Sequence, residues 1–216
     1  MTRDIYTEPV HVDVDSLGNL GPLAALAGVW EGQGLDTHPV AEGSEAEPYR
    51  ERVVFEPIDA QTNGPQLLYG LRYHVHINND EVLTFHEQVG YWLWEPATKT
   101  ILQTLAIPRG QVAMATGTAE PDAHRFTVKA TLGSPTAGII SAPFLNENFR
   151  TLSYTLTISL DDGGTLTYEQ DTVLQIAGQA EPFHHTDKNT LRRVAKPTPN
   201  PAALAEPVEA VPGGPT

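Results

Sequence analysis

The sequence contains no cysteine. Without thiols the chain can form no disulfide, thiolate nucleophile, or cysteine-ligated zinc or iron–sulfur centre. The absence suits a reducing compartment. We expect a cytoplasmic protein, because Met1 to Tyr6 bring no apolar segment of a secretory signal. No uninterrupted apolar run approaches the roughly 18 residues of a membrane span, so we expect no membrane insertion.

Positive charge is scarce. Thirteen Lys and Arg face 27 Asp and Glu, which gives a formal net charge of −14. The basic residues are spread along the chain, and Arg192 with Arg193 is the one local pair. Phosphate backbones and anionic membrane surfaces would be repelled, so neither nucleic acid nor membrane is an expected partner. The acidity itself indicates little more than solubility.

Glycine and proline are plentiful, at 18 residues each, which favours a β protein rich in turns. Apolar side chains alternate over Gln66–Ile77 and Thr151–Leu160, and a shorter strand is indicated at Arg52–Phe55. Asp161–Gly164 is a typical hairpin turn. About nine or ten such strands can be counted. The pattern predicts an all-β chain folded as a single antiparallel up-and-down β-barrel of about ten strands, similar to lipocalins and fatty-acid-binding proteins.

The pattern divides the chain into three parts. Residues 1–16 form an N-terminal extension, 17–195 the barrel, and 196–216 a disordered tail rich in proline. Within the barrel part, leucine recurs every third residue between Leu17 and Ala27. This spacing predicts a short helical segment, which could plug one end of the barrel.

Glycines occupy alternate positions around Trp30, at Gly28, Gly32 and Gly34. On a strand this spacing removes side chains from one face. It permits a ligand or another backbone to approach closely, but it serves equally well to bend a strand where a barrel closes.

Two of the eight histidines, His74 and His76, share one face of a predicted strand with Arg72. Imidazoles at positions i and i+2 could bind zinc. No carboxylate at matching spacing completes such a site in the sequence, so we do not assign one.

Three further histidines lie in strongly patterned segments. His86 precedes an apolar strand, and His184 and His185 open the last predicted strand. Alternation there places His185 on one face with Asp187, Asn189 and Leu191 and puts His184 on the other. An imidazole in an apolar cavity is costly unless it is hydrogen-bonded or bound to a metal, and heme iron is one such partner.

Three motifs together resemble those of the nitrobindin family of heme-binding β-barrels. These are Gly28–Gly34 followed by Pro39, which is similar to the family's GxWxGxG motif, the segment His86–Tyr91, and His185 with Arg192. The resemblance extends in order from Leu23 to Val194. The glycine motif is moderately specific by itself, and the three in sequence are much more so.

The resemblance implies a ten-stranded barrel that binds heme b. It makes His185 the axial iron ligand, with His184 as second choice, and places His86 on the distal side. It also implies a ferric heme that binds nitric oxide or converts peroxynitrite to nitrate, hence a peroxynitrite isomerase. The other cofactor-binding residues that it implies are Trp30, Gly32 and Gly34.

The sequence departs from the family pattern near the expected site. Asp36 stands where the glycine run often continues, and His38 stands where the family often has tyrosine before the proline. Asp187 and Asn189 are polar on the face that should carry the porphyrin. They could tune the axial histidine by hydrogen bonding, or they could indicate a cavity for a polar ligand.

Other functions remain open at this point. A carrier of a fatty acid or another small hydrophobic ligand needs a cation for the carboxylate, for which Arg72, Arg109 and Arg192 are candidates. An interaction module would have a packed interior. A serine hydrolase is disfavoured, since the sequence lacks a GxSxG elbow. The oligomeric state is open, with a homodimer among the options.

Overall fold

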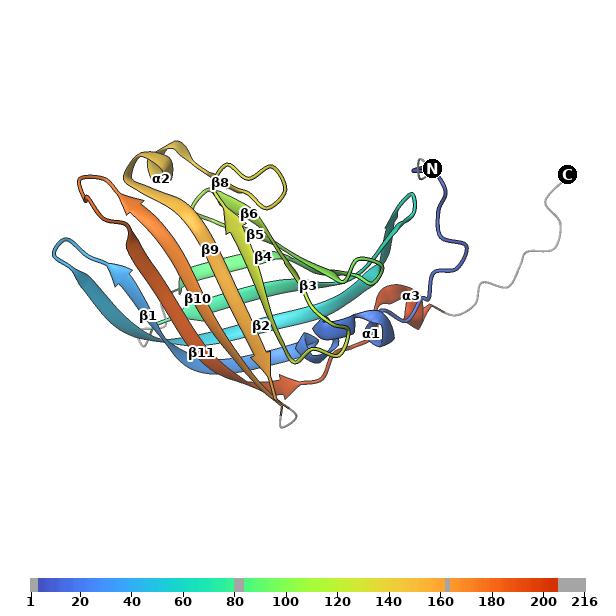
Figure 1. Cartoon of the computed structure of the whole chain (residues 1–216). Coiled ribbons are helices and arrows are strands. Elements are labelled where there is room, and N and C mark those ends of the chain that lie inside the picture. The colour runs from blue at the N-terminus through green and yellow to red at the C-terminus, as the bar shows by residue number, and fades with distance from the viewer. Residues whose placement is uncertain (1–3, 80–83, 162–163, 206–216) are drawn as a thin grey trace, which may run out of the picture.

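The computed structural model describes residues 4–79, 84–161 and 164–205 (Figure 1). Its helical elements are α1 (Ser16–Asn19), the 3₁₀ helix η1 (Gly21–Leu26), α2 (Pro143–Asn148) and α3 (Pro201–Leu204). Its strands are β1 (Gly28–Pro39), β2 (Ser44–Asn63), β3 (Gln66–Asn78), β4 (Thr84–Glu95), β5 (Thr100–Ile107), β6 (Gln111–Thr118), β7 (Arg125–Thr131), β8 (Ile139–Ser141), β9 (Phe149–Leu160), β10 (Thr165–Ile176) and β11 (Phe183–Ala195).

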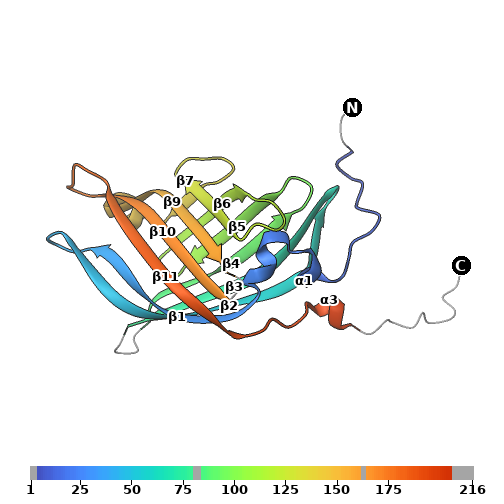
Figure 2. The same cartoon turned by 60° about the horizontal axis from the view of Figure 1, so that its bottom comes forward.

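The strands form a closed antiparallel barrel (Figure 2). Strands β1 to β7 and β9 to β11 make a ring of ten, in which β11 pairs with β1 and β9 pairs with β7. The short strand β8 adds to β6 outside this ring. Closure removes the exposed edges that an open sheet would leave. The structure therefore confirms the predicted single antiparallel β-barrel.

Alternation along each strand separates the inside of the barrel from the outside. On β7, Phe126, Val128 and Ala130 are buried, and the residues between them are exposed. Successive side chains of a strand point to opposite faces, so every second residue enters the interior. The periodicity read from the sequence thus separates a mainly apolar interior from the outer face.

The N-terminal helical segment closes one end of the barrel. Leu20, Leu23 and Leu26 are completely buried, and the indole Nε1 of Trp30 donates a hydrogen bond of 2.7 Å to the carbonyl oxygen of Leu26. Gly21 has a φ of 53°, and a Cβ there would lie 2.5 Å from the Trp94 indole, so this contact requires glycine. The predicted short helical segment is present and fills this end.

The opposite end of the barrel remains open. There the β1–β2 hairpin extends beyond the ring, away from α1 (Figure 1). Helix α2 lies beside this end and contributes Phe144 and Leu145 to the lining of an internal cavity. One half of the barrel is therefore packed, and the other half is hollow.

Within the tail predicted at 196–216, residues 196–205 contact the barrel. Asn200 is completely buried. Its side chain accepts a hydrogen bond from the Ser16 amide and donates to Val14 and Asp59. Helix α3 follows it and packs on β2. The prolines do not prevent this docking, because one buried polar side chain supplies the contacts. Residues 206–216 lie outside the described residues.

Among the described helices, none is both long and apolar enough to cross a lipid bilayer.

Candidate ligand-binding cavity

The hollow half of the barrel encloses a cavity of about 620 Å³. Strands β1 to β6, β8 to β11 and helix α2 contribute to its wall. Its volume lies within the range of small-molecule and cofactor sites. Much of the lining is apolar, and the residues that share this property include Val53, Phe55, Val75, Ile77, Leu105, Ile107, Phe149, Leu156 and Leu174.

His185 faces this cavity from β11. Its Nε2 lies 2.7 Å from Oδ1 of Asp36 on β1, and the other oxygen of the same carboxylate lies 3.1 Å from Nδ1 of His38. Burial by itself would raise the pKa of Asp36, but its interactions with the two histidines outweigh burial and lower that pKa below its usual value. Asp36 is therefore an anion that holds the ring nitrogen through which a histidine most often binds a metal.

His86 faces the cavity from β4. Burial, helped by the nearby positive charge of Arg109, lowers the pKa of its imidazole to about 4. The ring is therefore neutral at physiological pH. A neutral imidazole in a partly apolar cavity is the form that ligates metals.

His184 points away from the cavity. Its side chain is 62% exposed, and its Nδ1 lies 2.9 Å from Oδ2 of Asp171 on the neighbouring strand β10. The alternation of β11 thus separates the two adjacent histidines, with His185 inside and His184 outside.

The other residues of the glycine motif lie elsewhere. Trp30 is buried at the closed end, where the guanidinium of Arg193 stacks 4.6 Å from its ring. A Cβ on Gly32 would lie 2.5 Å from the carbonyl oxygen of Thr190, and one on Gly34 would lie 2.3 Å from the Tyr49 side chain. Trp30, Gly32 and Gly34 do not line the cavity of the described chain. Their placement favours the bent-strand reading of the motif, with Gly34 making room for Tyr49.

Two carboxylates and two tyrosines form an acidic cluster in the cavity wall. The hydroxyl of Tyr168 lies 2.8 Å from Oε2 of Glu51 and 3.0 Å from Oδ2 of Asp187. Tyr49 donates to Asp187 and lies 2.8 Å from the Tyr168 hydroxyl. Asn189 donates to Glu51 at 2.7 Å. We call Tyr49, Glu51, Tyr168, Asp187 and Asn189 the acidic cluster.

Burial governs ionisation in the acidic cluster. Glu51 is 5% exposed, and burial raises its pKa to about 7, although hydrogen bonds from Asn189 and Tyr168 oppose the change. Burial likewise raises the pKa of Asp187. Water is excluded and the two acids lie close together, so the charged forms are costly. Glu51 is thus a carboxyl group that titrates near neutral pH.

A second polar network crosses the cavity wall from β3 to β9. The amides of Gln88 and Gln103 donate to the Tyr73 hydroxyl at 2.6 and 3.4 Å, and Tyr154 donates to Gln103 at 3.1 Å. Each of these side chains finds its partner within the network. They give the apolar lining fixed dipoles without adding charge.

Two polar residues of β11 bind partners other than the histidine predicted as axial ligand. Asp187, which could either tune that histidine or indicate a polar ligand, accepts hydrogen bonds from Tyr49 and Tyr168. Asn189 binds Glu51. The carboxylate that holds His185 belongs to Asp36, which pairs across strands β1 and β11 with Asp187. The sequence marks Asp36 as a departure, but the register brings it to the histidine.

The sequence analysis does not single out Tyr49, Glu51 and Tyr168. The alternation along β2 could have identified two of them, because Tyr49 and Glu51 continue the inward positions of Val53 and Phe55. Glutamate is uncommon at inward positions, and where it occurs it often belongs to a functional site. Of the three arginines considered for a carrier, Arg109 lines the cavity, whereas Arg72 is an exposed partner of Glu56.

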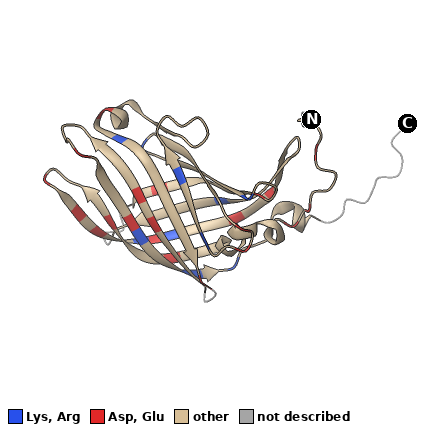
Figure 3. Ribbon diagram, viewed as in Figure 1, with Lys and Arg blue, Asp and Glu red and all other residues tan. Residues whose placement is uncertain are grey.

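Charge around the opening is mainly negative on one side. The β1–β2 hairpin carries the acidic residues Glu42, Glu45 and Glu47 (Figure 3). Glu47 and Arg109 both line the cavity. A ligand that enters therefore meets an acidic hairpin and one arginine.

A closed β-barrel with a partly apolar cavity of this size is typical of proteins that bind a small ligand. The chain belongs to the family of THAP4-like, heme-binding β-barrel domains, whose model matches residues 19–193. This match confirms the resemblance to the nitrobindin family. The crystal structure of Rv2717c from M. tuberculosis is similar in fold, with a TM-score of 0.55 and 22% sequence identity over 84% of this chain and 99% of that chain.

Proposed function

We propose that the cavity binds heme b, with His185 as the axial ligand and His86 on the opposite side of the iron. The observation that carries the proposal is a pair of imidazoles, His185 and the neutral His86, facing one cavity in a chain of a heme-binding family. The apolar lining of the cavity supports it, because a porphyrin plane is largely apolar. To bind iron through Nε2, His185 must give up its contact of 2.7 Å with Asp36. The loss of this contact lowers the affinity for heme.

The acidic cluster favours one orientation of the heme. Propionates beside Glu51 and Asp187 would add charge to a buried group of acids, so the propionates should face the opening. Arg109 lines the cavity near His86 and is the cation available to them there. The same reasoning disfavours a fatty-acid carrier whose carboxylate reaches deep into the barrel.

Bound ferric heme would supply a Lewis-acidic iron, at which nitric oxide binds or peroxynitrite isomerises to nitrate. The residues of this chain would contribute the environment. His86 stays neutral and can offer a hydrogen bond to a bound anion without adding a charge. The apolar wall limits water near the reacting atoms. We therefore propose peroxynitrite isomerisation as the protein's enzymatic activity.

Titration of the purified protein with hemin tests the proposal. We expect a sharp Soret band that saturates at one heme per chain, and we expect His185→Ala to lack this band. His184→Ala is the matched control, because that residue is exposed, and it should titrate like the wild type. A wild type that gives only the broad spectrum of free hemin would rule out heme binding. An unchanged spectrum in His185→Ala would rule out His185 as the ligand.

Asp36 provides a second test. Asp36→Ala removes the group that occupies Nε2 of His185, so we expect hemin to bind about tenfold more tightly, the equivalent of losing one hydrogen bond to a charged group. Competition with a heme-binding protein of known affinity measures this change. Asp171→Ala, which frees the outward His184 in the same way, is the control and should have no effect. Weaker binding in Asp36→Ala would show instead that Asp36 orients the ligand.

The catalytic part of the proposal needs its own measurement. Stopped-flow absorption follows peroxynitrite decay, and nitrate and nitrite are quantified at the end. We expect the ferric protein to accelerate decay and to raise the yield of nitrate, and His185→Ala to remove both effects. Decay at the rate of buffer alone would limit the function to heme or nitric oxide binding.

A further inference from the structure

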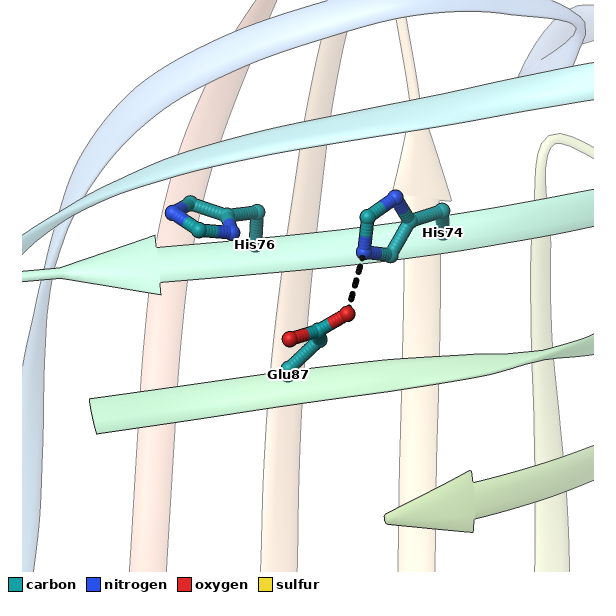
Figure 4. A group of neighbouring side chains, drawn as sticks. All are labelled: His74, His76 and Glu87. Atoms are coloured by element: carbon teal, nitrogen blue, oxygen red, sulfur yellow. Dashed lines mark hydrogen bonds and ion pairs between the residues drawn. The ribbon is translucent and has the colours of Figure 1, made fainter. Parts of the chain in front are cut away.

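Two histidines and one glutamate meet on the outer surface of the barrel, on the opposite face of the wall from the cavity (Figure 4). His74 and His76 lie on β3, and Glu87 lies on β4 directly across from His76 in the strand register. We propose that His74, His76 and Glu87 bind a divalent transition metal ion, with zinc as the metal of choice. The proposal is independent of heme binding.

The spacing of the donor atoms suits one ion. Nε2 of His74 lies 3.2 Å from Oε1 of Glu87, and ligand atoms of the three residues lie within 4.8 Å of one another. Donors around a tetrahedral zinc are roughly 3.4 Å apart, given bonds of about 2.1 Å. The side chains of His74 and Glu87 are 48% and 46% exposed, so small rotations can reach this geometry without moving the strands.

A neighbouring hydroxyl sets up His76 for the same role. Oγ1 of Thr84 lies 3.3 Å from Nε2 of His76. The other ring nitrogen of His76 lies on the side of the ring nearer Glu87 and His74 (Figure 4). With the proton on Nε2 shared with Thr84, Nδ1 keeps its lone pair for the metal. Metal-binding histidines usually have such a partner on the second nitrogen.

The charges around the three residues permit a cation. Arg52 and Arg72 lie on the same outer face, and each is paired with a carboxylate, Arg72 with Glu56 at 2.6 Å and Arg52 with Glu31 at 2.5 Å. The chain as a whole is strongly acidic, with a net charge of −14. Two imidazoles with one carboxylate are typical ligands of zinc and other late first-row metals, whereas calcium and magnesium prefer oxygen alone.

In the sequence no carboxylate at matching spacing completes a site with His74 and His76, but the fold brings Glu87 to them. Glu87 lies 11 residues beyond His76 and belongs to a different strand. Sequence spacing cannot place it, because its position depends on the register between β3 and β4. The pairing of His76 with Glu87 supplies the third ligand.

A metal here would join two strands of the cavity wall. The neighbours of the three residues, among them Val75, Ile77 and His86, point inward and line the cavity. An ion bound on the outside would tie β3 to β4 at the level of His86. We therefore expect zinc to raise the thermal stability of the protein.

Calorimetric titration of the metal-free full-length protein with zinc chloride tests the proposal. We expect one high-affinity ion per chain, and we expect His76→Ala and Glu87→Gln each to weaken binding by about tenfold or more. Cobalt should give the intense visible bands of a tetrahedral site in the wild type and not in these variants. Zinc should raise the melting temperature of the wild type and leave that of both variants unchanged.

Two controls separate this site from other histidines. His185→Ala removes a cavity imidazole, and His11→Ala removes an exposed imidazole of the N-terminal segment; both should bind zinc like the wild type. The proposal is overturned if zinc binds equally well to the wild type and to Glu87→Gln. It is also overturned if binding is lost in His185→Ala and kept in His76→Ala, since the ion would then lie in the cavity.

Discussion

Glu51 shows how one residue can make the stability of the barrel depend on pH. It is buried in the acidic cluster, where it accepts hydrogen bonds from Asn189 and Tyr168. Its pKa rises from 4.5 to about 7 because burial disfavours the charged form. Such a group favours the fold while it is protonated. Its contribution is complete below pH 4.5 and is lost as the pH rises through about 7.

Glu51→Gln should remove this pH dependence. Glutamine keeps an oxygen that accepts from Asn189 and carries no charge. Relative to the wild type, the variant should gain about 3 kcal/mol in free energy of unfolding between pH 4.5 and pH 8, as a shift of about 2.5 pKa units implies. Urea unfolding at several pH values measures the difference.

The control for this experiment is Glu45→Gln at an exposed position of the β1–β2 hairpin. Its stability should follow the wild type across the same range. A Glu51→Gln variant that tracks the wild type at every pH would mean that Glu51 ionises normally. In that case the acidic cluster would have to be hydrated.

Strand β1 illustrates what a single element contributes. Its glycines allow close contact on the side of β11, where Gly32 pairs with Leu191. Alternation alone could not say whether the glycines serve a ligand or the barrel wall. The contacts with Thr190 and Tyr49 show close packing in the wall, and a role of these glycines toward a ligand stays a prediction.

Gly32→Ala should therefore destabilise the barrel. The added methyl group would lie 2.5 Å from the carbonyl oxygen of Thr190, and backbone atoms cannot move aside easily. We expect a loss of about 1–3 kcal/mol, as for other overpacked sites, measured as a lower denaturation midpoint. The exposed neighbour Gln33→Ala is the matched control and should change stability by less than about 0.5 kcal/mol. Equal stability of both variants would contradict the close approach.

The bounds of strand β2 could not be predicted from the sequence. The pattern indicates a strand at Arg52–Phe55, but the observed strand runs over Ser44–Asn63. Pro48 and Pro57 read as interruptions, since proline cannot donate to a ladder. The strand continues through both and shifts register between Ile58 and Gln61. In the described pairings Pro48 lies where β2 pairs with β1, and Pro57 lies where β2 pairs with β3, so each proline needs a donor on one side of the strand at most.

Two described segments far apart in the sequence, one before the first strand and one after the last, meet outside the closed end of the barrel. Asn200 joins Val14 and Ser16 of the N-terminal segment to Asp59 of β2 through three hydrogen bonds. These partners are separated by as many as 186 residues in the sequence. Asn200, which follows the last strand, thus helps to hold the N-terminal helical segment at the closed end, although the composition around it resembles that of a linker.

Asn200→Ala should loosen this junction. It would leave the buried partners of one side chain without hydrogen bonds, at a cost of about 1–3 kcal/mol. The expected result is a lower melting temperature and faster amide exchange in η1, measured by hydrogen exchange with mass spectrometry. Asn63→Ala, at the exposed end of β2, is the control and should leave both unchanged. Unaltered exchange in η1 would mean that the plug holds without Asn200.

The architecture can be predicted from the sequence. Alternating apolar residues separate inside from outside, turn residues set the hairpins, and the leucine spacing predicts the helical segment that closes one end, because these features depend on neighbours within a few positions. Which side chains meet is visible only in the folded chain. Asp36 reaches His185 across 149 residues, Glu87 reaches His74 from the next strand, and Glu51 joins Asp187 inside the barrel. Alternation assigns a face to each residue, but only strand register and ring closure assign it a partner.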